Sequence, residues 1–206
     1  MFSWSVGYIW LMRIAQIAPV VERVPPKRYG GTERVVWALT EEEVKRGHEV
    51  TLFASGDSLT TAKLQSVFPR ALREAKLKDI YGFNYLTLLN IGVAYAMQDA
   101  FDIIHDHIMP LSLPAANLAT TPVVATMHGP FTQENRKLFQ TLRGPGIATI
   151  SNAQAYPAPN IHHVGTVYNG LPLAGYPFGE VPEDFLLFVG RISMEKGTHL
   201  AIEVAQ

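Results

Sequence analysis

Tyr29-Gly30-Gly31-Thr32-Glu33 is the stretch on which the fold prediction depends, because it lies between an apolar run and an amphipathic one. The apolar run covers residues 12–18 and the amphipathic run covers residues 35–45. Two adjacent glycines between a strand and a helix let the backbone come close to a ligand, and the helix start offers unpaired N–H groups to a negative charge. The stretch therefore predicts a phosphate-binding turn, although Gly-Gly at such a place also serves as an ordinary turn.

Outward from this stretch, short apolar segments alternate with amphipathic ones. Strands are predicted over 14–18, 49–54, 102–105, 122–127, 146–150 and 166–168, and helices over 32–46, 84–100, 111–118 and 132–142. Residues 58–79 are largely polar and give no clear prediction. Short apolar strands separated by helices are typical of a parallel sheet covered on both faces. The predicted fold class is therefore α/β, a Rossmann-like parallel sheet with helices on both faces.

Ligands of such sheets bind outside the carboxyl ends of the strands. Several glycine-rich or polar segments each follow a predicted strand, and we expect them to gather on one edge of the sheet. They are Gly30-Gly31, Ser55 to Asp57, His107, His128-Gly129 and Ser151-Asn152. His105 and His107 alternate along one strand, and we expect them to face opposite ways, with His107 in the cleft.

Composition narrows the class of ligand. A chain of 206 residues with 48% hydrophobic content can bury the core of one domain, or of one domain and the start of another. A net charge of −1 gives no electrostatic footprint for nucleic acid. The sequence has no cysteine, which excludes disulfides and thiolate metal sites and suits a reducing cytosol. Because the net charge suits neither nucleic acid nor an acidic membrane surface, the expected ligand is small and polar. No apolar run reaches the ~18 residues of a spanning helix.

Two regions depart from the alternating pattern. Residues 1–11 are aromatic-rich and lack the positive leading segment of a secretory signal, so we predict an extension left by an upstream start or by cloning. A membrane-surface anchor is the alternative for this segment. Residues 170–183 carry glycine and proline at a spacing that suits neither a helix nor a central strand, and are predicted to be a linker. Residues 184–206 are predicted to form a strand over 185–189, a basic glycine-containing turn and the start of a helix.

Seven short motifs occur along the chain. They are Gly30-Gly-Thr-Glu33, Arg46-Gly-His-Glu-Val50, Ile104-His-Asp-His107, Met127-His-Gly129, Ile150-Ser-Asn152, Val167-Tyr-Asn-Gly170 and Phe188-Val-Gly-Arg-Ile-Ser-Met-Glu-Lys-Gly197. In order and approximate spacing they resemble the retaining GT-B glycosyltransferases called family 4. The resemblance covers nearly everything from Met12 onward. It implies that residues 12–169 are the N-terminal, acceptor-side domain and that residues 184–206 begin a C-terminal donor domain.

The resemblance also implies roles for the residues that match. The glycine pair would lie near the donor diphosphate, the basic residues of the second domain would hold that diphosphate, and the histidine of the His-Gly motif would lie near the transferred sugar. The implied donor-phosphate residues are Gly30, Gly31, Arg191 and Lys196, and the implied catalytic-site residue is His128. The implied acceptor or cleft residues are Glu33, His107, Gly129, Ser151, Asn169 and Gly170.

Physical chemistry agrees with these roles. Sugar transfer builds negative charge on the departing diphosphate, and donors aimed at that charge lower the barrier. Arg191 can hold a phosphate through two hydrogen bonds, and Lys196 can supply a point charge. The acidic residues offer no compelling set of metal ligands, so we expect neither a metal nor another cofactor. No protein nucleophile is assigned.

The predicted function is transfer of a sugar from a nucleotide sugar to an unidentified acceptor, with retention of configuration. The resemblance places most donor contacts after Gln206, so the chain alone is expected to be inactive, as a fragment, a truncated product or part of a split enzyme. The alternative is a non-catalytic acceptor- or partner-binding module that associates through residues 184–206. A nicotinamide-binding enzyme is disfavoured, because the first strand is followed by no Gly-x-Gly-x-x-Gly turn. The expected location is the cytoplasm, free or at the inner face of a membrane.

Overall fold

The computed structural model describes residues 11–79 and 81–206, so the expectations for residues 1–10 lie outside the described residues. The chain divides into two units, one that ends at Leu171 and one formed by Pro172–Gln206. Each unit is described by itself.

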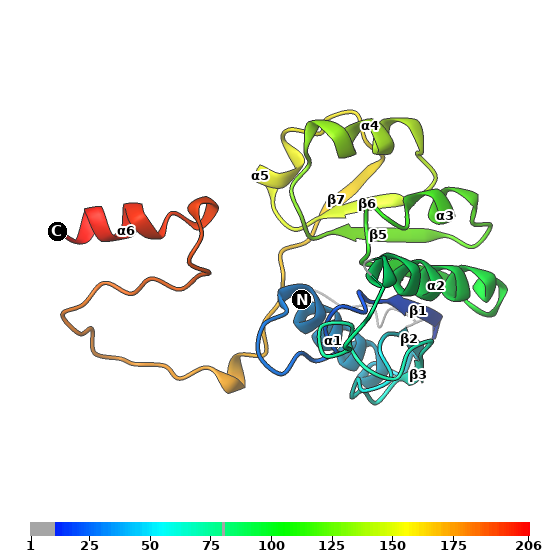
Figure 1. The fold of residues 1–206 in the computed structure, drawn as a ribbon, viewed down its shortest axis with the longest axis horizontal. Helices are drawn as coiled ribbons and strands as arrows, with labels where there is room; N and C mark the ends of the chain where they lie inside the picture. The colour runs from blue at the N-terminus through cyan, green and yellow to red at the C-terminus, as the bar shows by residue number, and fades with distance from the viewer. Residues whose placement is uncertain (1–10, 80) are drawn as a thin grey trace, which may run out of the picture. The chain divides into compact units, whose positions relative to one another are not determined.

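The first unit is built on a seven-stranded sheet with the strand order β3-β2-β1-β4-β5-β6-β7 (Figure 1). Every neighbouring pair of strands is parallel. The strands are β1 (Arg13–Ile17), β2 (Glu49–Phe53), β3 (Lys63–Gln65), β4 (Ile103–Asp106), β5 (Val123–Met127), β6 (Gly146–Thr149) and β7 (His163–Thr166). The helices are α1 (Gly31–Lys45), α2 (Gly82–Ala96), η1 (Gln98–Ala100), α3 (Leu113–Leu118), α4 (Gln133–Thr141) and α5 (Asn152–Ala155). The predicted α/β class is therefore confirmed.

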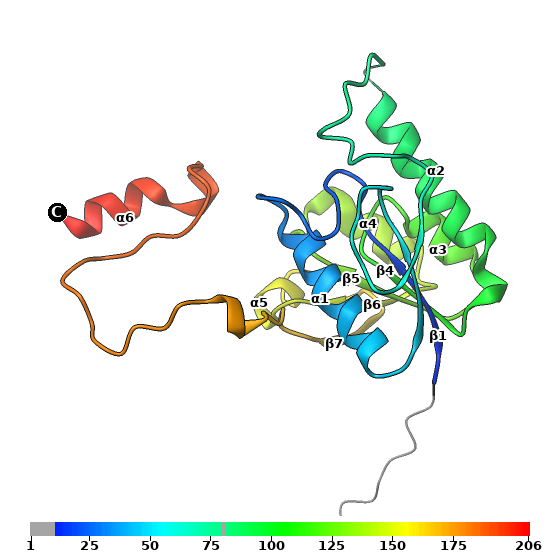
Figure 2. The same cartoon turned by 90° about the horizontal axis from the view of Figure 1, so that it is seen from below.

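Both faces of the sheet are covered, which is why β1 and β2 are buried at four successive residues after an exposed first one. On one face, Ile17, Ile104 and Met127 pack with apolar side chains of α2, α3 and α4. On the other face, Leu52 and neighbouring side chains pack with Val36 of α1. Figure 2 shows α1 and α2 on opposite sides of β1 and β4.

The order of the strands places a topological switch at the centre of the sheet. From β1 the chain builds outward through β2 to β3, and it then returns to place β4 on the other side of β1. Crevices at such a switch, at the carboxyl ends of the strands, are where open α/β sheets bind ligands. Two segments leave the sheet at this switch. They are the loop between β1 and α1 and the segment that follows β4.

The structure differs from the predicted elements at three places in the first unit. β3 and α5 were not predicted, because each is short and carries little apolar pattern. The last strand is β7 at His163–Thr166, a few residues before the predicted 166–168.

The second unit contains η2 (Leu173–Gly175), η3 (Met194–Lys196) and α6 (Thr198–Ala205), which agrees with a predicted turn and helix start. The strand predicted over 185–189 is wrong: no described segment pairs with it, and Phe185 and Val189 are 62% and 84% exposed. A strand requires a hydrogen-bonded neighbour, and apolar sequence alone does not supply one. Within the described ranges, no helix is long and apolar enough to cross a bilayer.

Candidate functional site

The segments expected on one edge do follow adjacent strands of a parallel sheet. In sheet order, Ser55 to Asp57 follow β2, Gly30-Gly31 follow β1, His107 follows β4, His128-Gly129 follow β5 and Ser151-Asn152 follow β6. Because all these strands run in one direction, their carboxyl ends share one edge. This carboxyl edge is the candidate site.

The two glycines before α1 have different surroundings. Gly30 has φ +142°, a conformation that side chains rarely adopt, and a Cβ built on it would lie 2.7 Å from Pro26 Cβ and 2.9 Å from Glu33 Oε2. Gly31 is exposed and has nothing within 4 Å of its Cβ position. Gly30 is therefore required by the turn itself, whereas Gly31 leaves open space at the helix start.

Glu33 lies in the first turn of α1 and is buried. Burial raises the pKa of its carboxyl group above the ordinary value. The side chain that was predicted to line the cleft thus packs under the glycine turn, next to the Gly30 backbone.

His107 and His128 meet at the ends of β4 and β5. His107 Nδ1 lies 2.9 Å from His128 Nε2, and His107 Nε2 lies 2.9 Å from Gln16 Oε1. His107 is buried and His128 is half-buried. The structure therefore brings together the two histidines predicted at the cleft and adds a glutamine from β1 that was not predicted.

The expectation that His105 and His107 face opposite ways is wrong. Their ring centroids are 4.2 Å apart, and both rings lie on the α1 face of the sheet. The physical reason is the period of a strand: successive residues point to opposite faces, so residues two apart point to the same face. His105 Nε2 lies 2.8 Å from Thr126 Oγ1, so this nitrogen has its own hydrogen-bond partner. His105 therefore lies beside the His107–His128 pair without joining it.

Gln16 joins this group to α1. Its Nε2 donates to Glu43 Oε1 and Oε2 at 2.9 and 2.8 Å, while Oε1 faces His107. Gln16 is fully buried. The one signal for it in the sequence is a polar residue inside an otherwise apolar strand segment, Ile14 to Ala18.

Burial lowers the pKa of the histidines in this group. The pKa of His105 falls to about 4, first through desolvation and then through the charge of His128. Desolvation lowers the pKa of His128 to about 4, and desolvation together with its histidine neighbours lowers the pKa of His107 well below the ordinary value. All three imidazoles are therefore neutral at pH 7 and act as hydrogen-bonding groups rather than as cations. Desolvation also raises the pKa of Glu43 to about 7.

The next loops along the edge are held by Gln154. Its Nε2 donates to the carbonyl oxygens of Met127 and Gly129, at 2.8 and 2.6 Å. The Ser151 hydroxyl accepts a hydrogen bond from the Gln154 N–H and caps α5. Gly129 and Ser151, predicted as cleft residues, are thus tied to each other through Gln154, which sequence reasoning did not single out.

The other predicted site residues lie farther along the chain. Asn169 and Gly170 are exposed near the end of the first unit. Arg191 and Lys196 lie in the second unit, where Arg191 forms an ion pair with Glu195 at 2.9 Å. The structure describes this basic pair within its own unit.

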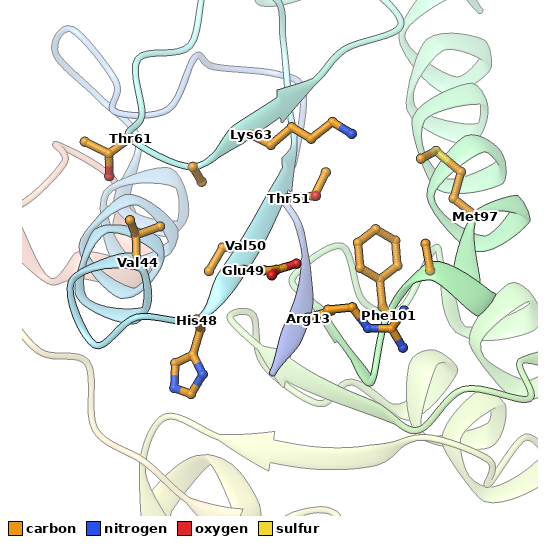
Figure 3. A pocket seen from close by; sticks show the side chains of 12 residues that line it. Arg13, Val44, His48, Glu49, Val50, Thr51, Thr61, Lys63, Met97 and Phe101 are labelled. Carbon is orange, nitrogen blue, oxygen red and sulfur yellow. The ribbon is translucent and has the colours of Figure 1, made fainter. Parts of the chain in front are cut away.

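A hollow of 460 Å³ lies away from the carboxyl edge (Figure 3). It is at the amino end of β1 and β2, and its lining includes Arg13, His48, Glu49, Lys63 and Phe101. None of the predicted site residues lines it. In the part of the chain that the structure describes, no group of three or more histidine, cysteine, aspartate or glutamate residues is placed to hold a metal ion.

Comparison with known proteins gives a family and a fold. A family model described as Glycosyltransferase Family 4 matches residues 29–170. The crystal structure of AviGT4, a glycosyltransferase involved in Avilamycin A biosynthesis, is similar to this chain, with a TM-score of 0.59 and 25% sequence identity. The similarity covers 91% of this chain and 52% of AviGT4, so the chain spans about half the length of that protein. No curated protein matches the chain.

Proposed function

We propose, since this chain belongs to glycosyltransferase family 4, that it forms the acceptor-side half of an enzyme that transfers a sugar from a nucleotide sugar with retention of configuration. The observation that carries this proposal is the His107–His128 pair, 2.9 Å apart at the carboxyl ends of adjacent strands. The pair lies one strand from the switch between β1 and β4, where sheets of this class bind ligands. In this proposal His128 contacts the transferred sugar and the surrounding loops receive the acceptor.

The donor diphosphate would be bound by groups from both units. Gly31 leaves room for a close approach to the start of α1, where backbone N–H groups attract negative charge. Arg191 and Lys196 would add positive charge from the second unit, because charge accumulates on the leaving diphosphate during transfer. With these donors the reaction needs no metal ion, and we expect turnover to be unchanged by EDTA.

The neutral state of His128 fits this role. An imidazole with a pKa of about 4 carries no charge at pH 7, so it binds a sugar hydroxyl by hydrogen bonding and does not compete with Arg191 and Lys196 for the phosphates. Retention is proposed without a protein nucleophile. A cytoplasmic location, free or at the inner face of a membrane, belongs to the same proposal and suits a sequence without cysteine.

The test is a calorimetric titration of the 206-residue chain with UDP-, GDP- and ADP-linked sugars, repeated on a chain extended through a second domain where the gene encodes one. We expect binding and transfer by the extended chain, a product with the anomeric configuration of the donor, and weak or no donor binding by the shorter chain. His128→Ala in the extended chain should lower turnover by about 100-fold or more, whereas Thr126→Val, a neighbouring change, should leave it nearly unchanged. An inverted product, or full turnover by His128→Ala, would contradict the proposal.

The exposed apolar segment at 185–189 favours one further candidate function. Its five side chains are apolar and exposed, and such a surface favours association with another chain. In this second candidate, the chain is a non-catalytic acceptor- or partner-binding module that another chain completes. Analytical ultracentrifugation distinguishes the two: a concentration-dependent dimer that Leu187→Glu abolishes, with no transfer by the extended chain, supports the module.

A further inference from the structure

A chain of hydrogen bonds runs from α1 through the sheet to His128, and its direction is fixed at Glu43. Above pH 7, where Glu43 is mostly ionised, its carboxylate only accepts hydrogen bonds, and both of its oxygens lie within 2.9 Å of the Gln16 Nε2 atom. The amide nitrogen of Gln16 must therefore face Glu43. The amide oxygen is left to face His107 Nε2, at 2.9 Å.

The next two bonds follow from that orientation. Because Gln16 Oε1 can only accept, His107 Nε2 carries a proton and donates it. His107 is buried and neutral, so its other nitrogen, Nδ1, is unprotonated and accepts. The partner at 2.9 Å is His128 Nε2, which must therefore be the protonated nitrogen of His128.

A side branch agrees with this direction. The Gln16 amide has a second N–H, and His105 Nδ1 lies 3.5 Å from Nε2. His105 Nδ1 thus faces a donor, and its protonated Nε2 donates to Thr126 Oγ1 at 2.8 Å. Every polar atom of the Gln16 amide is used, and the reverse orientation of the amide would set its oxygen against the Glu43 carboxylate.

One nitrogen remains at the end of the chain. His128 is half-buried, and among the residues that the structure describes its Nδ1 has no hydrogen-bond partner. With the ring neutral and Nε2 protonated, Nδ1 is an unprotonated acceptor. We propose that Gln16 is a positioning residue: through His107 it holds His128 in the Nε2–H tautomer, so that Nδ1 accepts a hydrogen bond from a hydroxyl group of the bound sugar.

This arrangement would give the site a preference among ligands. A site built to receive a hydroxyl proton discriminates against an analogue that lacks the hydroxyl, because the half-buried acceptor is then left unpaired. The identity of the ligand as a sugar rests on the proposed function. The tautomer itself does not, since it follows from contacts within the chain.

The first test measures the direction of the chain in the unchanged protein. At pH 8, where Glu43 is ionised, scalar coupling across the hydrogen bond in ¹⁵N-labelled protein reports which nitrogen carries the proton between His107 and His128. We expect the proton on His128 Nε2, coupled to an unprotonated His107 Nδ1. A proton attached to His107 Nδ1, or no coupling between these two nitrogens, would overturn the proposal.

An unconstrained histidine side chain also prefers the Nε2–H tautomer, so the second test reverses the direction of the hydrogen bonds. In Gln16→Lys the ammonium group can only donate, and it can also pair with Glu43. We expect His107 and His128 both to shift to the Nδ1–H tautomer. The double change Gln16→Glu and Glu43→Gln restores an acceptor towards His107 and should return His128 to Nε2–H.

A matched control separates this chain from its side branch. Thr126→Val removes the partner of His105 and leaves the path from Gln16 to His128 intact, so the His128 tautomer should not change. If folded Gln16→Lys keeps His128 in the Nε2–H form, the positioning role is wrong. If the tautomers respond as expected but the chain extended through the second domain binds and transfers no nucleotide sugar, the positioning role stands and the proposed function fails.

Discussion

The two faces of the sheet differ in how their polar side chains are hydrogen-bonded, and β4 contributes side chains to both faces. On the α2 face, Ile104 is fully buried in the apolar core, and the Asp106 carboxylate accepts hydrogen bonds from the Tyr95 hydroxyl at 2.7 Å and the Ile108 N–H at 2.8 Å. On the α1 face, His105 and His107 belong to a chain of hydrogen bonds that ends at His128. The Asp106 carboxylate is thus paired within the α2 face, whereas the hydrogen bonds of the α1 face end at His128 Nδ1, which has no partner among the described residues.

This difference indicates that the two faces of β4 have different roles. The α2 face supplies most of the packing, and the α1 face supplies the polar groups of the candidate site. Changes on the first face should therefore lower stability at every pH, whereas changes on the second should alter how stability depends on pH. The following predictions test that division.

The largest effect is expected on the apolar face. Ile104→Ala removes a fully buried side chain and leaves a cavity, so we expect the free energy of unfolding to fall by about 2–5 kcal/mol. Urea unfolding followed by circular dichroism measures the change at pH 7 and pH 5. A loss that differs strongly between the two pH values would show that the two faces are not separate in this way.

The next effect concerns the pH dependence of the histidine face. The pKa of His105 is about 4 in the folded chain and 6.5 in the unfolded chain, so the unfolded state binds the extra proton first. The stabilisation due to neutral His105 is complete above pH 6.5 and is lost as the pH falls from 6.5 to 4. Glu43, whose pKa is raised, acts in the opposite direction below pH 7.

Replacing His105 measures how much this one histidine contributes to the pH dependence of the free energy of unfolding. For His105→Asn we expect the fall in the free energy of unfolding between pH 6.5 and 4 to be shallower by about 1.4 kcal/mol per pH unit. Denaturant titrations at half-unit pH intervals give the slope, and Thr132→Ser, which lies outside this group of histidines, serves as the control. Equal slopes for the variant and the unchanged chain would mean that His105 is protonated in the folded state.

A smaller effect separates the two glycines at the start of α1. Gly30→Ala forces a side chain into a positive φ and against Pro26, and should cost about 1–3 kcal/mol. In Gly31→Ala the new methyl group points into open space in the first turn of the helix, so the stability of the protein should be unchanged or slightly raised. Thermal melts of the two variants side by side give the comparison. Equal melting temperatures would contradict the difference in their surroundings.

The smallest effect is expected outside both faces, at the start of α4. The Thr132 hydroxyl accepts from the Asn135 N–H, and the Asn135 side chain accepts from the Thr132 N–H. Thr132→Ala removes one side of this capping box and should cost about 1 kcal/mol, while Thr132→Ser should keep the cap. Chemical unfolding resolves a difference of this size. A serine variant as unstable as the alanine variant would exclude the hydroxyl as the cause.

Sequence reasoning succeeded where the signal is local. The parallel α/β class follows from apolar segments that alternate with helices, and the edge on which the candidate residues lie follows from that class alone. The seven motifs, each made of three to ten neighbouring residues, indicate the family by their order along the chain. Each of these inferences needs only neighbouring residues and a general rule about sheets.

The inferences that failed or were missed depend on partners far along the chain. Gln16 contacts Glu43 and His107, which are 27 and 91 residues away, and no local pattern indicates those contacts. β3 is a strand because it pairs with the edge of β2, since its own sequence is largely polar. The segment at 185–189 has the opposite property: its sequence favours a strand, but no neighbour pairs with it.

The switch at the centre of the sheet also has a kinetic consequence. β1 completes its hydrogen bonding only when β4 arrives, and Arg13 and Asp102, which join the two strands, are 89 residues apart in the chain. The chain loses the entropy of closing this long loop before the contacts between β1 and β4 form. This order slows folding. During synthesis, β1 and β2 can pair early, but β1 can pair with β4 only after more than half of the first unit has left the ribosome.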